Sequence, residues 1–145
     1  MKVKDVMTPD VECIGPDGSL QDAATKMKTR DVGPILVCEG DTVVGILTDR
    51  DIVVRAVAEG RDARTTRVQD CMTRDVVFVH EDDDVKDAAR RMKDHQVRRV
   101  VVLTREGKLC GIVSTKDIAV DTGDKKLAGD VLKEVSEDAA LAGKR

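Results

Sequence analysis

The chain contains the stretch Gly45-Ile46-Leu47-Thr48-Asp49-Arg50-Asp51-Ile52, and about 65 residues later it contains Gly111-Ile112-Val113-Ser114-Thr115-Lys116-Asp117-Ile118. In both stretches a glycine leads apolar residues, a hydroxyl residue follows, and an aspartate comes three positions later. The surrounding sequence repeats too, and each copy opens with Met-Thr. Such self-similarity indicates repeated structural units. Units of about 60 residues bury little core alone, so we expect the two copies to pack together and the pair to form a homodimer.

The order of predicted elements is the same in both copies. In the first copy an apolar run at 10–14 predicts a strand, and the turn sequence Gly15-Pro16-Asp17-Gly18 ends it. Ser19 is placed to cap the following helix. The other predicted features of this copy are apolar helix positions at Leu20, Ala23, Ala24 and Met27, hairpin strands at 35–38 and 43–47 with a turn at 39–41, and a second helix at 51–58.

This pattern predicts a mixed α/β (α+β) fold of two tandem β-α-β-β-α repeats. The second copy runs over 76–120, and the apolar positions Leu127, Val131, Leu132 and Val135 predict a C-terminal helix. The expected divisions of the chain are a first repeat at 1–60, a linker at 61–67, a second repeat at 68–121 and a helical tail at 122–145.

Composition excludes several classes of function. The formal net charge is −3 with a pI near 5.4, and Phe78 is the one aromatic residue, which disfavours nucleic-acid binding. No apolar run is long enough for a membrane span and no signal region begins the chain, so we expect a cytoplasmic protein with no membrane contact. No nucleophile, base and orienting group occur together, so we expect neither an enzyme nor a catalytic cofactor.

The repeated hydroxyl and aspartate are the most specific candidate site. Where a strand enters a helix, Thr48 or Ser114 can face an anion, and Asp51 or Asp117 can accept hydrogen bonds from a vicinal diol such as ribose. This combination suits a nucleoside phosphate. The same spacing is also that of a capping box, which stabilises a helix without any ligand. Both interpretations stay open at this point.

The tandem unit, opened by Met-Thr and closed by the glycine-led motif, resembles a pair of CBS domains, the Bateman module, over about residues 1–121. The resemblance implies two repeats with pseudo-twofold symmetry and clefts that take an adenosine-containing ligand, either an AMP/ATP-type nucleotide or S-adenosylmethionine. In that family the diol-binding aspartate corresponds to Asp51 or Asp117, and the hydroxyl at the helix start corresponds to Thr48 or Ser114. Small stand-alone members of the family are the most similar in pattern.

The resemblance also implies that each adenine pocket uses the opening strand of the opposite repeat. The residues so assigned are Thr8 and Val11 for the site of Asp117, and Thr73 and Val76 for the site of Asp51. Relatives with bound nucleotide often meet phosphate with a basic pair before the second strand, where this chain has Arg98 and Arg99.

The first repeat has Gly33 and Pro34 at the positions of that basic pair. Guanidinium groups bind phosphate oxygens in pairs and a Gly-Pro step cannot, so we expect the Asp117 site to prefer phosphorylated ligands. The Asp51 site is then expected to take a less charged adenosine derivative or none. The alternative for Arg98 and Arg99 is a solvated edge or salt bridges to the acidic run at 81–84.

Cys13 and Cys38 form a second candidate site, based on thiol chemistry. Both fall in predicted strands of the first repeat, where neighbouring positions bring the sulfurs close. They are either buried thiols that replace apolar residues or a disulfide or metal pair.

The leading prediction for the whole chain is a regulatory ligand-binding module that acts through conformation or an unknown protein partner. The alternatives are a dimeric interaction scaffold without a nucleotide site, and a thiol or metal sensor.

Overall fold

A computed structural model describes residues 1–121, 123, 126–127 and 129–133 of the chain. Its elements divide into two compact units, and each unit holds one three-stranded sheet. The first-sheet unit comprises residues 11–76, and the second-sheet unit comprises residues 1–10 together with the chain from residue 77 onward. The mixed α/β fold with two β-α-β-β-α repeats is confirmed.

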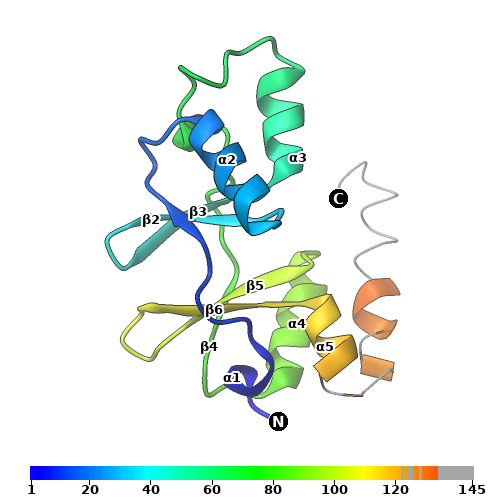
Figure 1. Ribbon diagram of the computed structural model, residues 1–145. Coiled ribbons are helices and arrows are strands. Elements are labelled where there is room, and N and C mark those ends of the chain that lie inside the picture. The colour runs from blue at the N-terminus through cyan, green and yellow to red at the C-terminus, as the bar shows by residue number, and fades with distance from the viewer. Residues whose placement is uncertain (122, 124–125, 128, 134–145) are drawn as a thin grey trace. The chain divides into compact units, whose positions relative to one another are not determined.

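The first-sheet unit follows the predicted element order. Its elements are β1 (Cys13–Ile14), α2 (Leu20–Arg30), β2 (Ile35–Glu39), β3 (Thr42–Leu47), α3 (Asp49–Ile52), the π-helical turn η1 (Val53–Val57) and the 3₁₀ turn η2 (Val68–Asp70). β2 lies between β1, which is parallel to it, and β3, which is antiparallel. Helices α2 and α3 cover one face of this sheet (Figure 1).

Local capping explains where these helices begin. The Ser19 hydroxyl accepts a hydrogen bond of 3.0 Å from the Asp22 N–H, which confirms Ser19 as the cap of α2. The second helix begins at Asp49, two residues before the predicted start, because Thr48 caps it. The predicted strand at 10–14 is wrong in length: β1 holds only Cys13 and Ile14, and Asp10 has a left-handed φ of 54°, which breaks extended pairing.

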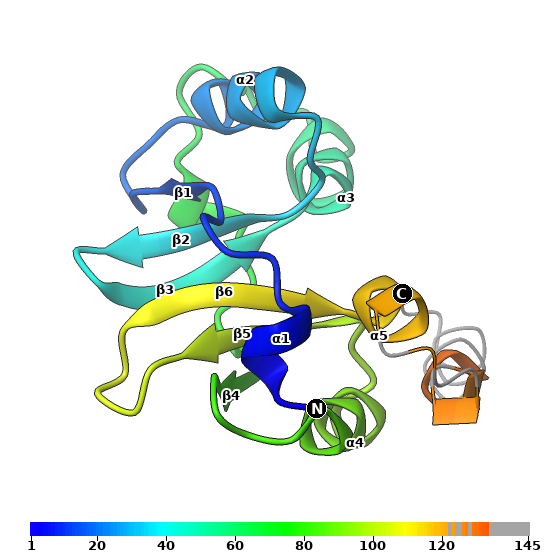
Figure 2. The same cartoon turned by 60° about the horizontal axis from the view of Figure 1, so that its bottom comes forward.

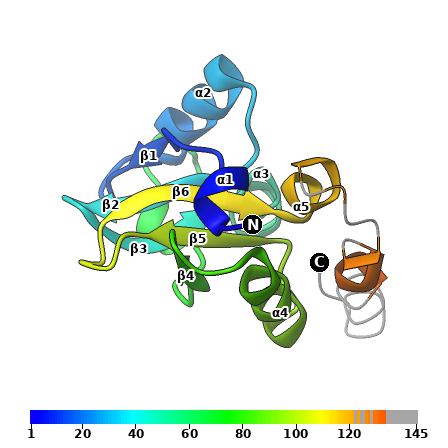
Figure 3. The ribbon, with the colours of Figure 1, turned by 90° about the horizontal axis from the view of Figure 1, so that it is seen from below.

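The second-sheet unit repeats the same series. Its elements are α1 (Val3–Val6), β4 (Phe78–His80), α4 (Val85–His95), β5 (Arg99–Leu103), β6 (Leu109–Ser114) and α5 (Thr115–Asp121). β5 lies between parallel β4 and antiparallel β6, and α4 and α5 cover one face (Figure 1). The N-terminal α1 lies beside β6 (Figures 2 and 3).

Each unit has its own apolar core. The first core gathers buried residues of α2, β2, β3 and the segment 68–72, and the second gathers those of α4, β5, β6 and α5. Val3 and Val6 of α1 are buried in the second core, although they precede the first repeat in sequence. Ala24, predicted on the apolar face of α2, is exposed. The compact units and the sequence repeats are therefore different divisions of the chain.

The Met-Thr segments and the motif glycines meet at the edges of the sheets. Thr73 exchanges backbone hydrogen bonds of 2.9 and 2.8 Å with Ile46 of β3. A Cβ atom built on Gly45 would lie 2.6 Å from the Met72 Sδ and 2.9 Å from the Thr73 carbonyl oxygen. Only glycine permits so close an approach. Thr8, Ile112, Gly111 and Met7 repeat this arrangement on β6.

The predicted C-terminal helix lies partly within the described residues. Residues 126–127 and 129–133 are helical, Val131 is buried in the core of the second-sheet unit and Leu127 packs against that core. Leu132 is exposed. Val135 lies outside the described residues. This segment covers apolar surface of its own unit, as its spacing predicts.

Candidate ligand-binding sites

The hydroxyl and carboxylate of the first motif hold one another at the end of β3. The Thr48 N–H donates to Asp51 Oδ2 at 3.0 Å, and the Asp51 N–H donates to Thr48 Oγ1 at 3.1 Å. Asp51 is only 3% exposed. This reciprocal pair is a capping box, so the prediction that the motif caps a helix is confirmed. A carboxylate has two oxygens with about four acceptor sites, so a capping hydrogen bond does not by itself exclude binding to a diol.

The second motif has the same geometry at the end of β6. The Ser114 N–H donates to Asp117 Oδ2 at 2.9 Å, and the Asp117 N–H donates to Ser114 Oγ at 3.1 Å. Ser114 and Asp117 are both half-buried, so the second carboxylate is more open to solvent than the first. The two predicted sites thus share one local framework but differ in exposure.

The threonines of the opening segments lie near these motifs. Thr73 pairs with Ile46, two residues before Thr48 on β3, and Thr8 pairs with Ile112, two residues before Ser114 on β6. Thr73 is therefore in the unit of Asp51, and Thr8 in the unit of Asp117. Val76 is half-buried in the first-sheet unit. Val11, which the resemblance assigns to the Asp117 site, also falls in the first-sheet unit.

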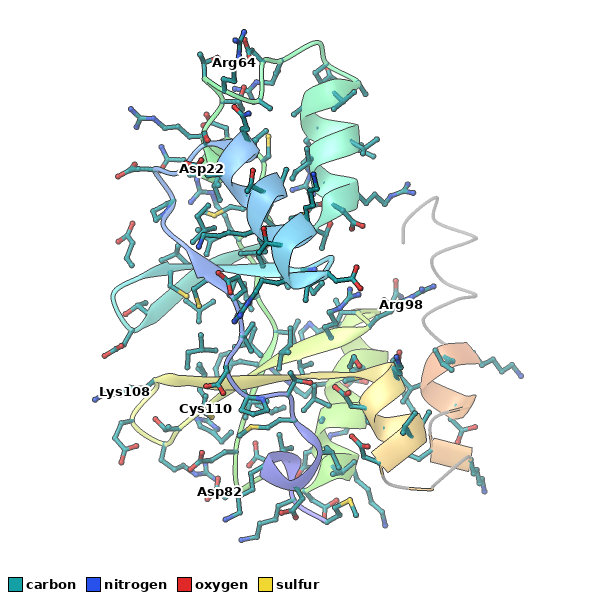
Figure 4. The ribbon with its side chains drawn as sticks, in the orientation of Figure 1. Asp22, Arg64, Asp82, Arg98, Lys108 and Cys110 are labelled. Atoms are coloured by element: carbon teal, nitrogen blue, oxygen red, sulfur yellow. The ribbon has the colours of Figure 1, made fainter. Side chains whose placement is uncertain are left out.

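Arg98 and Arg99 lie at the start of β5, opposite the end of β6. The Cα partner of Arg99 is Ser114, and the Arg98 carbonyl accepts a hydrogen bond of 3.0 Å from the Thr115 N–H. Both arginines are exposed, and Arg98 points outward from the unit (Figure 4). Within the described part of their unit, neither guanidinium makes an ion pair. The acidic run instead pairs with Arg105.

Gly33 occupies the place of Arg98 in the first-sheet unit. Its carbonyl accepts a hydrogen bond of 3.2 Å from the Asp49 N–H, as the Arg98 carbonyl does from Thr115. A Cβ atom on Gly33 would lie 3.3 Å from Asp49 Oδ1. The two repeats are therefore equivalent in backbone at this point and differ in charge.

Arg55 lies beside the candidate Asp51 site, and the sequence did not predict it there. Its Nη1 donates to the Cys71 carbonyl at 2.9 Å and to Thr73 Oγ1 at 3.3 Å, and its Nη2 lies 3.9 Å from Asp51 Oδ1. It therefore connects two residues that the resemblance assigns to one site. The spacing of four residues from Asp51, which places both on one helix face, is the signal that could have found it.

Cys13 and Cys38 are neighbours, as their strand positions predict. Their sulfur atoms lie 3.5 Å apart between β1 and β2, and both side chains are half-buried. Burial, together with the hydrogen bond from Cys38 to Cys13, raises the pKa of Cys38 to about 12. Among the described residues no third His, Cys, Asp or Glu joins them as a metal-binding group.

A hollow of about 350 Å³ lies elsewhere, between β4 and α4 of the second-sheet unit. Its lining includes Phe78, with the Arg91 guanidinium 5.8 Å from the ring centre. None of the residues predicted for ligand binding lines it. The hollow is thus separate from the predicted sites.

Comparison with known proteins identifies the class. The CBS domain model matches residues 3–57 and 68–120, so the chain belongs to the CBS domain family, as a tandem pair. CBS-domain pairs are regulatory ligand-binding modules. The chain is 38% identical to the CBS domain-containing protein YhcV of Bacillus subtilis over 92% of this chain and 94% of that protein.

Two solved structures share the fold with the same TM-score. The hypoxic response protein of Mycobacterium tuberculosis, solved with two coordinated zinc ions, matches with a TM-score of 0.74 and 34% identity over 82% of this chain and 97% of that one. The CBS domain pair of protein MJ0100, solved with 5-methylthioadenosine and S-adenosyl-L-methionine, matches with a TM-score of 0.74 and 27% identity over 86% and 98%. The resemblance to small CBS-pair proteins is confirmed.

No helix in the described ranges combines the length and the apolar character that crossing a bilayer requires.

Proposed function

We propose that this protein is a regulatory module, not an enzyme, that binds an adenosine-containing ligand at Asp51 and Asp117. The candidate ligands are AMP, ATP and S-adenosylmethionine, and the output is a change in conformation or in affinity for a protein partner. The observation that carries the proposal is the repeated arrangement of a hydroxyl, a buried or half-buried carboxylate and an opening threonine at the end of β3 and of β6. The adenosyl ligands of the MJ0100 pair support it.

The charge around each site refines this proposal. Arg98 and Arg99 have no ion partner within the described part of their unit and lie beside the strand that carries Ser114, so their donors are available to a phosphate. The Asp117 site therefore prefers phosphorylated adenosine. Arg99→Ala should weaken AMP binding more than adenosine binding, and equal losses for the two ligands would contradict the phosphate role.

Calorimetric titration of the full chain with AMP, ATP and S-adenosylmethionine tests the proposal. Asp51→Asn and Asp117→Asn are the informative variants, because one amide oxygen can cap the helix or accept from a diol but cannot replace both carboxylate oxygens. Each should weaken binding at its own site roughly 10-fold or more, the value of a hydrogen bond to a charged group. Asp41→Asn, on the exposed β2–β3 turn, is the matched control. No heat or thermal shift with any ligand would refute the proposal and favour the dimeric scaffold.

A homodimer is part of the same proposal. The helical segment formed by α3 and η1 exposes Val53, Val54 and Val57, with exposed fractions of 56%, 44% and 65%. Three exposed valines on one short segment are an apolar surface that association would cover. The protein is expected to work in the cytoplasm.

The thiol pair supports a second candidate function, a redox sensor. A peroxide can take two electrons and two protons from Cys13 and Cys38, which joins the sulfurs and releases two waters. The 3.5 Å separation favours this bond, while the raised pKa of Cys38 keeps the thiol protonated and the reaction slow at neutral pH. Alkylation and mass spectrometry after peroxide treatment measure the bond. Cys110→Ser is the control, and an unchanged redox and metal response in Cys13→Ser would eliminate this function.

A further inference from the structure

The Asp51 site has a cation of its own, Arg55, which lies outside the repeated motif. Arg55 lies one helical turn after Asp51, and its guanidinium contacts Asp51, Thr73 and the Cys71 carbonyl. The side chain is nevertheless 43% exposed. It is thus held in place by the site and still accessible to a ligand.

The hydrogen-bonding capacity of Arg55 is only partly used. The contacts to Cys71 and Thr73 both come from Nη1, and the 3.9 Å distance from Nη2 to Asp51 is longer than a hydrogen bond. A guanidinium has five N–H donors, so within the part of the chain that the structure describes, donors on Nε and Nη2 are left for another acceptor. Adjacent donors of this kind bind two oxygens of one phosphate.

The charge of Arg55 also decides which ligands Asp51 can tolerate. A lone carboxylate repels a phosphate, whereas the neighbouring guanidinium offsets that repulsion and attracts the anion. Asp51 can then accept from the ribose hydroxyls while Arg55 donates to the phosphate. The sulfonium of S-adenosylmethionine occupies the place of the 5′-phosphate and is positive, so Arg55 disfavours it.

The second-sheet unit has the opposite arrangement. The residue equivalent to Arg55, four positions after Asp117, is Asp121, while its cations Arg98 and Arg99 correspond to Gly33 and Pro34. The first-sheet unit therefore has a cation four positions after its motif aspartate, and the second-sheet unit has cations at the start of its central strand. The two units differ in where the positive charge lies, not in whether they have one.

We infer that Arg55 makes the Asp51 site selective for nucleoside phosphates over unphosphorylated adenosine and S-adenosylmethionine. This inference rests on the proposed function, because it assumes that Asp51 binds the ribose. It replaces the expectation, based on Gly33 and Pro34 alone, that the Asp51 site takes a less charged ligand or none.

Titration of the full chain in an Asp117→Asn background isolates the Asp51 site. With AMP, adenosine and S-adenosylmethionine as probes, Arg55→Gln should weaken AMP binding about 10-fold or more, change adenosine binding less than about 2-fold, and leave S-adenosylmethionine equal or tighter. Arg55→Lys should keep part of the AMP preference, because it keeps the charge but loses the paired donors. Arg50→Gln, an exposed arginine on the same helix, is the matched control and should change none of the three.

Several outcomes would overturn the inference. Equal losses of AMP and adenosine in Arg55→Gln would assign Arg55 a purely structural role in holding the Cys71–Thr73 segment. Unchanged AMP binding would remove Arg55 from the site. If the Asp117→Asn chain binds no AMP while the Asp51→Asn chain does, the inference fails and the proposed function survives at Asp117. If the unmodified chain binds none of the probes, both fail.

Discussion

Replacing Gly45 with alanine tests the close approach on which the first-sheet unit depends. The added Cβ would meet the Met72 Sδ at 2.6 Å and the Thr73 carbonyl oxygen at 2.9 Å. The sulfur is on a flexible side chain and can move, but the carbonyl belongs to the backbone. Its movement would weaken the two hydrogen bonds between Thr73 and Ile46.

The expected magnitude follows from these contacts. Overpacking of this kind costs about 1–3 kcal/mol, and the weakening of the two hydrogen bonds is part of that cost. Alanine also restricts the unfolded chain, which returns about 0.4–1 kcal/mol. The free energy of unfolding should therefore fall by about 1–2 kcal/mol. At roughly 4 °C per kcal/mol for a chain of this size, the melting temperature should fall by about 4–8 °C.

Thermal and urea denaturation measure the effect, and Gly15→Ala is the control. A Cβ on Gly15 has no atom within 4 Å, so that variant should stay within about 0.5 kcal/mol of the parent. With Met72→Ala as the reference chain, Gly45→Ala should still lower the free energy of unfolding, because the Thr73 carbonyl remains. A melting temperature for Gly45→Ala equal to that of Gly15→Ala would refute the argument.

Three further predictions concern local contacts. Ser19→Ala removes the cap of α2 and should lower the free energy of unfolding by about 1 kcal/mol, measured by urea denaturation; no change would mean that the cap is not required. The hydrogen bond from Lys26 lowers the pKa of Glu12 below its usual 4.5, so this carboxylate stabilises the fold above that pH and the contribution is lost as the pH falls. Melting curves of Glu12→Gln should thus show a smaller acid-induced drop than the parent, and identical drops would contradict the assignment. Val57→Glu should shift sedimentation toward the monomer, and an unchanged sedimentation coefficient would exclude the α3–η1 surface from the dimer interface.

The repeat motifs predict the element order well because their signals are local. The Ser19 cap, the hairpin turn with Gly40 at a φ of 61°, and the Thr48–Asp51 pair all involve residues within a few positions of one another. Side-chain periodicity over such distances is readable from one sequence. The strand predicted at 10–14 is shorter in the structure, because Asp10 has a left-handed φ that the apolar pattern does not indicate.

Long-range pairing could not be predicted in the same way. Nothing near Thr8 indicates that it pairs with Ile112, more than a hundred residues away, or that Val3 is buried in the second core. The family resemblance assigns Thr8 to the Asp117 site. Its backbone pairing with Ile112, two residues before Ser114, could be found only from the structure. Arg55 was missed for a related reason, because its hydrogen-bond partners Cys71 and Thr73 lie 16 and 18 residues further along the chain.

In the proposed site, Arg55 also connects ligand binding to the segment that contains Cys71 and Thr73. A ligand reports its presence only if it binds two states of the protein with different affinity. The guanidinium that would bind phosphate also holds the Cys71 carbonyl and the Thr73 hydroxyl, and the first-sheet unit ends three residues after Thr73. A phosphate on the Nε and Nη2 donors would therefore bind the same guanidinium that holds these two contacts through Nη1. In the proposed site, ligand binding and the position of the Cys71–Thr73 segment are thus coupled through one side chain.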